Sequence, residues 1–238
     1  MGSKVFSRIE PYLRSSAVTT NAVTTDLFEQ KEEAIQNTPS HYIHGDALTQ
    51  NRLVQKEIYI PEKTTGTISI YTASPSTVVE LVSPDGTIIP ALKPTVDQMM
   101  FSGANLYTFN VKDFSPGTWT VQMKAKEAND AYLLASTFNE ENVYKLNMAG
   151  TGKAEQTGFT IHTPKNANTS NMSVKVIDKD GVELKQNILP KTTIGADVAA
   201  TLPKVPKPGV YNMTIDITTK HPNGKESIRT LVRSVYID

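Results

Sequence analysis

The side chains that could carry out chemistry in this chain are few and far apart. The 238 residues include no cysteine and four histidines, His41, His44, His162 and His221. Nucleophilic hydrolysis needs a serine, threonine or cysteine beside a general base, and no G-x-S-x-G turn that would present a serine occurs. His162 falls in a strand pattern and His221 in a turn pattern, where solvent-facing histidines are expected. The sequence therefore predicts no catalytic residues and no enzyme activity.

Two short clusters could bind a metal ion. His41, His44 and Asp46 lie close together in the sequence, and two imidazoles with a carboxylate can hold zinc. We expect a loop here, which orients ligands poorly, and no fourth ligand is evident. Asp178 and Asp180 flank a turn and could join a calcium site, although Asp-Gly is also a common hairpin turn. We expect both clusters to be structural and the protein to hold no metal or other cofactor.

Charge and composition argue against further classes of function. Lys+Arg and Asp+Glu both number 24, so the net charge is zero and the chain lacks the basic clusters that bind nucleic acid. The hydrophobic content of 38% is enough to build a buried core. No apolar run approaches the roughly 20 residues that span a bilayer, and residues 1–14 contain no apolar signal-peptide core.

Apolar residues alternate with polar ones from about Leu53 onward. A period of two predicts strands with one buried and one solvated face, as in an antiparallel sheet. Turn sequences such as Pro84-Asp85-Gly86 and Ser115-Pro116-Gly117 separate the runs. Many short strands with this spacing predict an all-β fold, a sandwich or a barrel. The residues predicted to face the core are Ile58, Ile60, Ile68, Ile70, Tyr107, Phe109, Val111, Trp119, Val121 and Met123.

The first 50 residues lack this alternation. Asp26 to Glu29 has the form of a helix capping box, and the apolar residues from Leu27 to Ile35 fall on one face of a helix. Another helix between Val5 and Arg14 would contain Pro11, which weakens it. We therefore expect residues 1–50 to form a partly helical N-terminal segment.

The two halves of the remaining chain repeat the same landmarks. Val79, Leu81 and Pro84-Asp85-Gly86 return as Val174, Val176 and Asp178-Lys179-Asp180-Gly181. Gly181 lies 95 residues after Gly86, and Gly209 of the second Pro-Gly pair lies 92 residues after Gly117 of the first. Nearly equal offsets predict an internal duplication. We expect two tandem immunoglobulin-like β-sandwiches, residues 51–140 and 141–238, the second ending in a hairpin turned at 221–224.

The repeated motifs also resemble a known kind of module. Leu81 to Gly86 followed by Pro116 to Val121 resembles β-sandwich modules that lie beside von Willebrand factor A domains in exported bacterial and animal proteins. Pro208 to Tyr211, with Arg229-Thr230 on the next strand, is similar to the same pattern. The resemblance covers residues 54–238. The arrangement also resembles a bacterial family of unknown function in exported proteins, including secreted proteins of gamma-proteobacterial pathogens. The resemblance implies an extracellular or periplasmic location and supplies no catalytic residues.

Four aromatic residues are assigned by their register. Trp119 and Tyr211 share faces with apolar neighbours and are predicted to lie in the cores. Tyr59 and Tyr71 lie opposite the isoleucines of their strands and are predicted to form an exposed pair. Such pairs often only stabilise a sheet, but exposed tyrosines also form platforms that bind proteins or glycans.

The sequence is therefore interpreted as a non-catalytic binding or presentation module of an exported bacterial protein. The partner would be a protein or a glycan, with no nucleic acid and no membrane span involved. Two alternatives stay open. The chain could be the accessory C-terminal region of a larger secreted enzyme, or it could be a structural spacer.

Overall fold

The computed structural model shows an all-β chain. Its described residues form strands and connecting turns, and no helix occurs among them. The helices expected before residue 40 lie outside the part that the structure describes. The described ranges are 40–98, 103–128, 130–140, 144–149, 158–164, 168–178, 183–189, 197–201 and 208–237.

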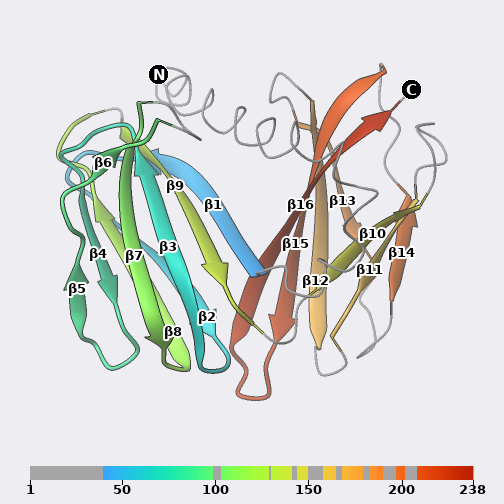
Figure 1. Ribbon diagram of the computed structural model, residues 1–238, viewed down its shortest axis with the longest axis horizontal. Coiled ribbons are helices and arrows are strands. Elements are labelled where there is room, and N and C mark those ends of the chain that lie inside the picture. The colour runs from blue at the N-terminus through green and yellow to red at the C-terminus, as the bar shows by residue number, and fades with distance from the viewer. Residues whose placement is uncertain are drawn as a thin grey trace. The chain divides into compact units, whose positions relative to one another are not determined.

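The first of two compact units ends at Asn139 and is a sandwich of two sheets (Figure 1). One sheet has the strand order β1-β9-β3-β7-β6 and the other β2-β8-β4-β5. Strand β8 pairs antiparallel with β2 and β4, and β3 pairs antiparallel with β7 and β9. The strands are β1 Ser40–Leu48, β2 Leu53–Ile60, β3 Thr64–Thr72, β4 Val78–Val82, β5 Ile88–Pro90, β6 Thr95–Val96, β7 Asn105–Phe114, β8 Gly117–Lys124 and β9 Asp130–Phe138.

The second unit includes Glu140–Asp238 and also contains two antiparallel sheets. Their strand orders are β10-β11-β14 and β13-β12-β15-β16. The expected terminal hairpin is confirmed, because β15 and β16 pair along their whole length and turn at His221–Gly224. The strands are β10 Lys145–Ala149, β11 Gly158–His162, β12 Thr169–Asp178, β13 Glu183–Leu189, β14 Val198–Thr201, β15 Gly209–Lys220 and β16 Glu226–Ile237.

The repeated sequence motifs occupy equivalent places in the two units. In the first unit β4 pairs with β8 so that Leu81 lies opposite Val121. In the second unit β12 pairs with β15 so that Val176 lies opposite Met213. Val176 follows Leu81 by 95 residues and Met213 follows Val121 by 92, which are the offsets of the turn glycines. The duplicated sequence therefore builds the same strand pair in the same register.

The strands outside the repeated motifs are arranged differently. In the first unit the early strand β2 pairs with β8, while the last strand β9 pairs with β3 in the other sheet. In the second unit the early strand β10 pairs with β11, while the last strand β16 stays beside β15. The neighbour of the second motif strand is therefore an early strand, β2, in the first unit and the last strand, β16, in the second.

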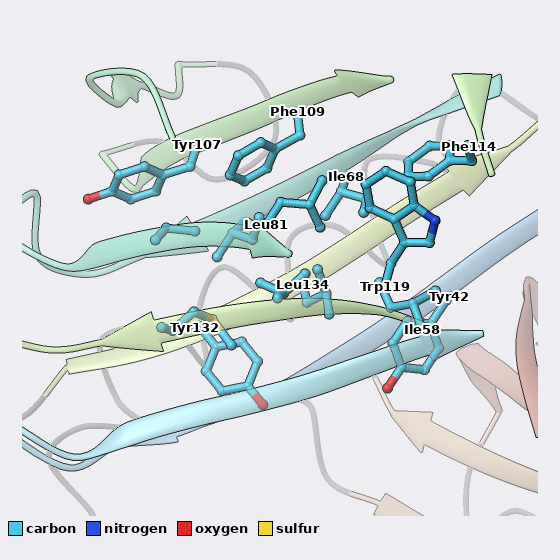
Figure 2. Close-up of a cluster of buried hydrophobic side chains, with 14 of the residues drawn as sticks. Tyr42, Ile58, Ile68, Leu81, Tyr107, Phe109, Phe114, Trp119, Tyr132 and Leu134 are labelled. Carbon is cyan, nitrogen blue, oxygen red and sulfur yellow. The ribbon is translucent and has the colours of Figure 1, made fainter. Parts of the chain in front are cut away.

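Aromatic rings are spread through the first core, and Trp119 and Phe114 lie close together in it (Figure 2). Trp119 packs edge-on against Phe114, with ring centroids 4.9 Å apart and planes at 79°. Phe114 meets Phe138 in the same manner at 5.6 Å. The indole N–H of Trp119 donates to the carbonyl of Ser115 at 3.0 Å, so this buried polar atom is satisfied. The predicted core position of Trp119 is confirmed.

The second core confirms the predicted position of Tyr211. It is 4% exposed and lies on the same side of β15 as Met213, Ile215 and Ile217, which are fully buried. These side chains pack with residues of β11 and β12, so the core lies between the two sheets of the unit.

The loop expected around His41, His44 and Asp46 is wrong, because this segment is strand β1 beside β9. Tyr42 and Leu48 point into the first core at even-numbered positions. His44 and Asp46 take the two even positions between them, so polar residues interrupt the apolar alternation and conceal the strand. The first unit thus begins at β1, before the expected boundary at residue 51.

Replacing Trp119 with alanine is expected to lower the free energy of unfolding of the first unit by about 3–5 kcal/mol, because it removes a buried aromatic ring and leaves a cavity. Leu53→Ala is the matched control, since this side chain is 51% exposed and its loss should cost about 0.5 kcal/mol or less. Chemical denaturation followed by circular dichroism measures both variants. Equal midpoints for the two variants would contradict the core assignment.

The two Pro-Gly motifs provide a second matched pair. Gly117 has a φ of +137°, and a Cβ there would lie 2.7 Å from the Pro84 Cβ. Gly209 has a φ of +155° with no described atom near its Cβ position. Both alanine variants should be destabilised, but Gly117→Ala by about 1–3 kcal/mol more, because of the added clash. Urea denaturation would contradict this if Gly209→Ala were the less stable variant.

Candidate functional site

The expected platform of Tyr59 and Tyr71 is not formed. Tyr59 lies on β2 and Tyr71 on β3, and these strands belong to different sheets of the first unit. Tyr59 is half-buried, whereas Tyr71 is only 8% exposed. Alternation placed both rings correctly on the side opposite the core isoleucines, but strands that follow each other in sequence need not pair. The exposed tyrosine pair is therefore wrong.

Tyr59 instead belongs to a polar sheet surface, here called the β8 face. The register aligns Gln55, Gln122 and Glu80 in one cross-strand row, and Tyr59 beside Thr118 in another. A row between them contains Glu57, Thr120 and Val82. All are exposed or half-buried, and they alternate with residues of the core. The β8 face is made of Gln55, Glu57, Tyr59, Glu80, Val82, Thr118, Thr120 and Gln122.

The chemistry of the β8 face is that of hydrogen bonding on a rigid support. Two amides and two carboxylates can together donate and accept hydrogen bonds, and the hydroxyls of Thr118 and Thr120 can do either. Neighbouring strands lie roughly 4.8 Å apart, so the groups stand at regular intervals. Tyr59 adds an aromatic ring with a polar end.

His44 is held by two neighbours in the first unit. Its Nδ1 lies 2.9 Å from the hydroxyl of Tyr132, with the rings stacked at 5.9 Å, and its Nε2 lies 3.4 Å from Nζ of Lys56. A lysine ammonium can only donate, so Nε2 accepts and Nδ1 carries the proton that is donated to Tyr132. Because Lys56 places a positive charge beside Nε2, this imidazole is poorly suited to bind a cation.

Tyr132 is buried in the core and is not suited to act as a base. Burial raises the pKa of its hydroxyl, and the carboxylate of Asp46 raises it further. The phenol therefore stays protonated. Tyr132 is the buried end of a hydrogen-bonded chain that continues through His44 to Lys56.

Asp130 is a buried carboxylate whose hydrogen bonds fix the turn between β3 and β4. Its Oδ1 accepts from the backbone N–H groups of Ala73 and Ser74, each at 3.1 Å, and of Ala131 at 2.8 Å. Its Oδ2 accepts from the hydroxyl of Thr77. Four donors satisfy this carboxylate, so its role is to hold the loop in place.

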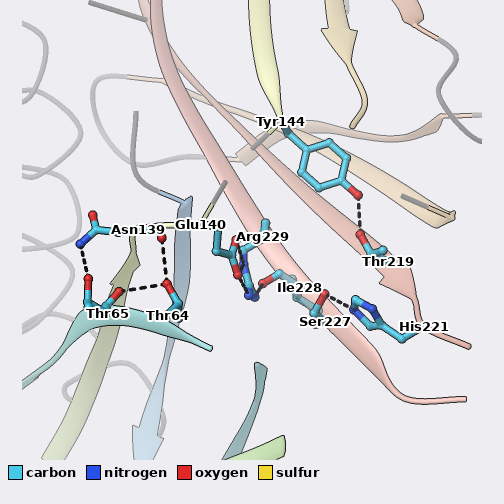
Figure 3. Close-up of polar contacts among 10 residues, drawn as sticks. All are labelled: Thr64, Thr65, Asn139, Glu140, Tyr144, Thr219, His221, Ser227, Ile228 and Arg229. Carbon is cyan, nitrogen blue, oxygen red and sulfur yellow. Dashed lines mark hydrogen bonds and ion pairs between the residues drawn. The ribbon is translucent and has the colours of Figure 1, made fainter. Parts of the chain in front are cut away.

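The last residue of the first unit is attached to β3 (Figure 3). The carbonyl of Asn139 accepts from the hydroxyl of Thr64 at 2.9 Å, and its side-chain amide donates to the Thr65 hydroxyl at 2.7 Å. The Asn139 N–H also donates to the Thr65 carbonyl at 3.0 Å. The end of β9 is therefore fixed within its own unit.

The second unit contains a buried ion pair between its first residue and its last strand. Arg229 donates from Nε to both carboxylate oxygens of Glu140 at 2.9 and 3.1 Å, and from Nη2 to one of them (Figure 3). The two side chains are 5% and 7% exposed. Nη1 also donates to the carbonyl of Ile228 at 2.9 Å. The sequence pattern assigned Glu140 no role and did not reveal this pair.

His221 and His162 make polar contacts within the second unit. Burial lowers the pKa of His221, and the nearby Arg229 lowers it further, against the opposing effect of Glu140. Its Nε2 lies 2.8 Å from the hydroxyl of Ser227. His162 lies 2.7 Å from a carboxylate oxygen of Asp197 and 2.9 Å from the Asn147 amide.

No sequence-predicted metal cluster is assembled among the residues that the structure describes. They include no group of three or more His, Asp or Glu side chains placed to hold a metal ion. β12 ends at Asp178, and Asp180 lies outside the described residues, as does the turn that leads to β13. Within the described ranges there is also no helix long and apolar enough to cross a membrane.

A shallow groove lies beside β4, lined by residues 75–80 and 90–94 with Tyr107 and Lys126. The Tyr107 hydroxyl donates to the carbonyls of Pro75 and Thr77 at 3.1 and 2.7 Å, so its polar atom is already engaged there. None of the residues singled out as a site from the sequence lines this groove.

The buried ion pair leads to a prediction about stability. Glu140→Gln should lower the free energy of unfolding of the second unit by about 3–5 kcal/mol, because it leaves Arg229 buried without a counter-charge. The control is the exposed pair Lys63 and Asp113, which lie 2.8 Å apart with side chains 72% and 56% exposed. Asp113→Asn should cost about 1 kcal/mol or less. Hydrogen exchange along β16 and β9 compares the two variants, and equal effects would contradict the assignment.

Comparison with known proteins identifies similar folds among solved structures but does not assign the chain to a family. No family model matches the sequence, and a search of curated proteins finds no match. The resemblance to modules beside von Willebrand factor A domains is therefore based on sequence motifs alone.

Solved structures are similar at low sequence identity. A Bacillus licheniformis lipase in its propeptide form is 19% identical with a TM-score of 0.60, over 84% of this chain and 42% of the lipase chain. A tetra-tandem repeat from the extending region of a large adhesion protein is 13% identical with a TM-score of 0.29, over 85% of this chain and 50% of the repeat chain. This chain thus spans less than half of the lipase chain, and that similarity shows a shared fold.

Proposed function

We propose that this chain is a non-catalytic binding module of an exported bacterial protein and that the β8 face is its binding surface. The observation that carries this proposal is the regular array of amide, carboxylate and hydroxyl groups with Tyr59 on a rigid sheet. The other groups that could do chemistry serve the fold. His44 and Asp130 are hydrogen-bonded inside the first unit, and Glu140 and His221 inside the second.

The composition of the β8 face favours a hydroxyl-rich ligand such as a glycan. Sugar hydroxyls both donate and accept hydrogen bonds, and the side chains of Gln55, Glu80 and Gln122 offer both in one row. The apolar face of a sugar ring can pack on an aromatic ring such as Tyr59. A protein partner that offers a polar edge is the other class of ligand that this surface fits.

A second candidate function is that of an accessory region in a larger secreted enzyme. The observation that favours it is the similarity of fold to a Bacillus licheniformis lipase in its propeptide form, where the match covers 42% of the lipase chain. In this case the catalytic groups would belong to another part of the native protein. Turnover of a p-nitrophenyl ester by this chain alone would contradict both candidates.

The test of the β8 face is a binding measurement. The labelled chain is applied to an array of bacterial and host oligosaccharides, and the best oligosaccharide is then titrated by calorimetry. Tyr59→Ala and Gln122→Ala should each weaken binding about tenfold or more, which corresponds to roughly 1.4 kcal/mol. Thr108→Ala is the control, because this exposed residue lies on the other sheet.

The results separate the candidate ligands. Loss of oligosaccharide binding in the two β8-face variants, with Thr108→Ala unchanged, supports a glycan module. A silent array, together with capture of a protein that the same two variants fail to retain, supports a protein partner. Equal binding by all three variants would place the site away from the β8 face and overturn the proposal.

A further inference from the structure

The shallow groove beside β4 adjoins the β8 face. The β4 groove, as we call it, is lined by residues 75–80 and 90–94 with Tyr107 and Lys126, so Glu80 belongs to both surfaces. Its volume is about 310 Å³, and sites that bind small molecules measure roughly 300–1,000 Å³. The groove is therefore large enough for a small part of a ligand that continues onto the β8 face.

Both walls of the β4 groove are held in place within the first unit. On one wall, the hydroxyl of Thr77 donates to the buried carboxylate of Asp130, which also fixes the backbone of the same loop. On the other wall, the N–H of Ala91 donates to the carbonyl of Val79 at 3.0 Å. Prolines at both ends of the segment 90–94 restrict its backbone further. The groove is formed before a ligand arrives, which lowers the entropy cost of binding.

The charged groups of the β4 groove differ from its other polar groups. The Ser76 hydroxyl donates to the carboxylate of Glu127 at 2.9 Å, and the Tyr107 hydroxyl donates to two carbonyls of the same loop. Lys93 and Lys126 are exposed, and their ammonium groups have no hydrogen-bond or ion-pair partner in the part of the chain that the structure describes. These two cations are therefore the groups that can recognise a ligand by charge.

The surface around these two cations is apolar and basic. Val78 is 40% exposed and Leu92 is 84% exposed. The register places the exposed Lys124 opposite Val78, in the cross-strand row next to that of Glu80. Glu80 is the one acidic residue among those that line the groove. This end of the sheet thus combines three lysines with apolar side chains and is complementary to an anion on an otherwise uncharged ring.

We propose that the β4 groove binds the carboxylate-bearing sugar of an acidic oligosaccharide whose remaining sugars lie on the β8 face. Lys93 and Lys126 bind the carboxylate through charge-assisted hydrogen bonds, and Val78 and Leu92 contact the apolar face of the sugar ring. Glu80, at the border of the two surfaces, accepts a hydrogen bond from a sugar hydroxyl. The inference rests on the proposed function, because it specifies the class of glycan that the β8 face recognises.

An acidic peptide is the other ligand that would match the charge of the β4 groove. The neighbouring surface favours the oligosaccharide. Beyond Glu80 the cross-strand rows continue with the amides of Gln122 and Gln55 and the hydroxyls of Thr118 and Thr120, which suit a chain of hydroxyl groups.

The test compares acidic oligosaccharides with their neutral counterparts. Sialylated and uronic-acid oligosaccharides are titrated into the full chain by calorimetry, beside the same compounds after desialylation or reduction of the carboxyl group. An acidic oligosaccharide should bind at least about tenfold more tightly than its neutral form. This preference should decrease with added NaCl, because salt screens charges at an exposed site.

The two lysines are then replaced together, as Lys93→Gln with Lys126→Gln. This variant should bind the acidic oligosaccharide only as tightly as the neutral form, and its affinity for the neutral form should not change. Lys112→Gln with Lys225→Gln is the matched control, because it removes the same charge from exposed positions outside the groove and should keep the preference. Emission of Trp119, the single tryptophan, verifies that the first unit stays folded.

The outcomes separate this inference from the proposed function. Equal affinity for acidic and neutral forms, or a preference that survives Lys93→Gln with Lys126→Gln, would overturn the groove assignment and leave the β8 face to the test with Tyr59→Ala. If the lysine variant loses the preference and Tyr59→Ala binds normally, the groove assignment is supported and the β8 face is not. No binding of any oligosaccharide would overturn both. A short polyglutamate peptide that binds as tightly as the acidic oligosaccharide would overturn the glycan assignment, because the groove would then recognise charge alone.

Discussion

The antiparallel strand pair that carries the repeated motifs is the interaction on which both units depend. It is β4 with β8 in the first unit and β12 with β15 in the second, and its register is the same in both. Because side chains alternate across a strand, this register decides which residues are buried and which are solvated. A shift by one residue would turn Leu81 and Val121 to solvent and place the polar groups of the β8 face in the core.

The part of this fold that could be predicted from the sequence is the part encoded locally. Alternation is a property of a single strand, so the core positions of Ile58, Trp119 and Tyr211 followed from it. The partner of a strand is set by distant residues. β2 pairs with β8 about 60 residues further along the chain, and the repeated motifs do not show which other strand lies beside β8 or β15. The Tyr59 and Tyr71 pair failed for this reason.

Residue type alone also could not show which polar side chains have a chemical role. His44, Asp130 and Glu140 are the types that catalysis or metal binding would use, but here they satisfy buried partners. Burying such groups is costly unless each one is hydrogen-bonded or paired. The Glu140 and Arg229 pair joins residues 89 positions apart, which no local pattern reveals. One signal was available, because Arg229 takes an inward position opposite Ile217 and so requires a buried counter-charge.

The outer faces of the two sheets of the first unit differ in polarity. Along β2, β4 and β8 the polar side chains of the β8 face alternate with core residues, so this outer face can stay hydrated. The other sheet differs, because a second apolar cluster of Tyr71, Ala104 and Leu133 lies outside the main core and gives β3 and β9 buried apolar side chains on both faces. A strict alternation of apolar and polar residues therefore describes β2 and β8 but fails at the end of β3 and β9, where Tyr71 and Leu133 are buried next to the core residues Ile70 and Leu134.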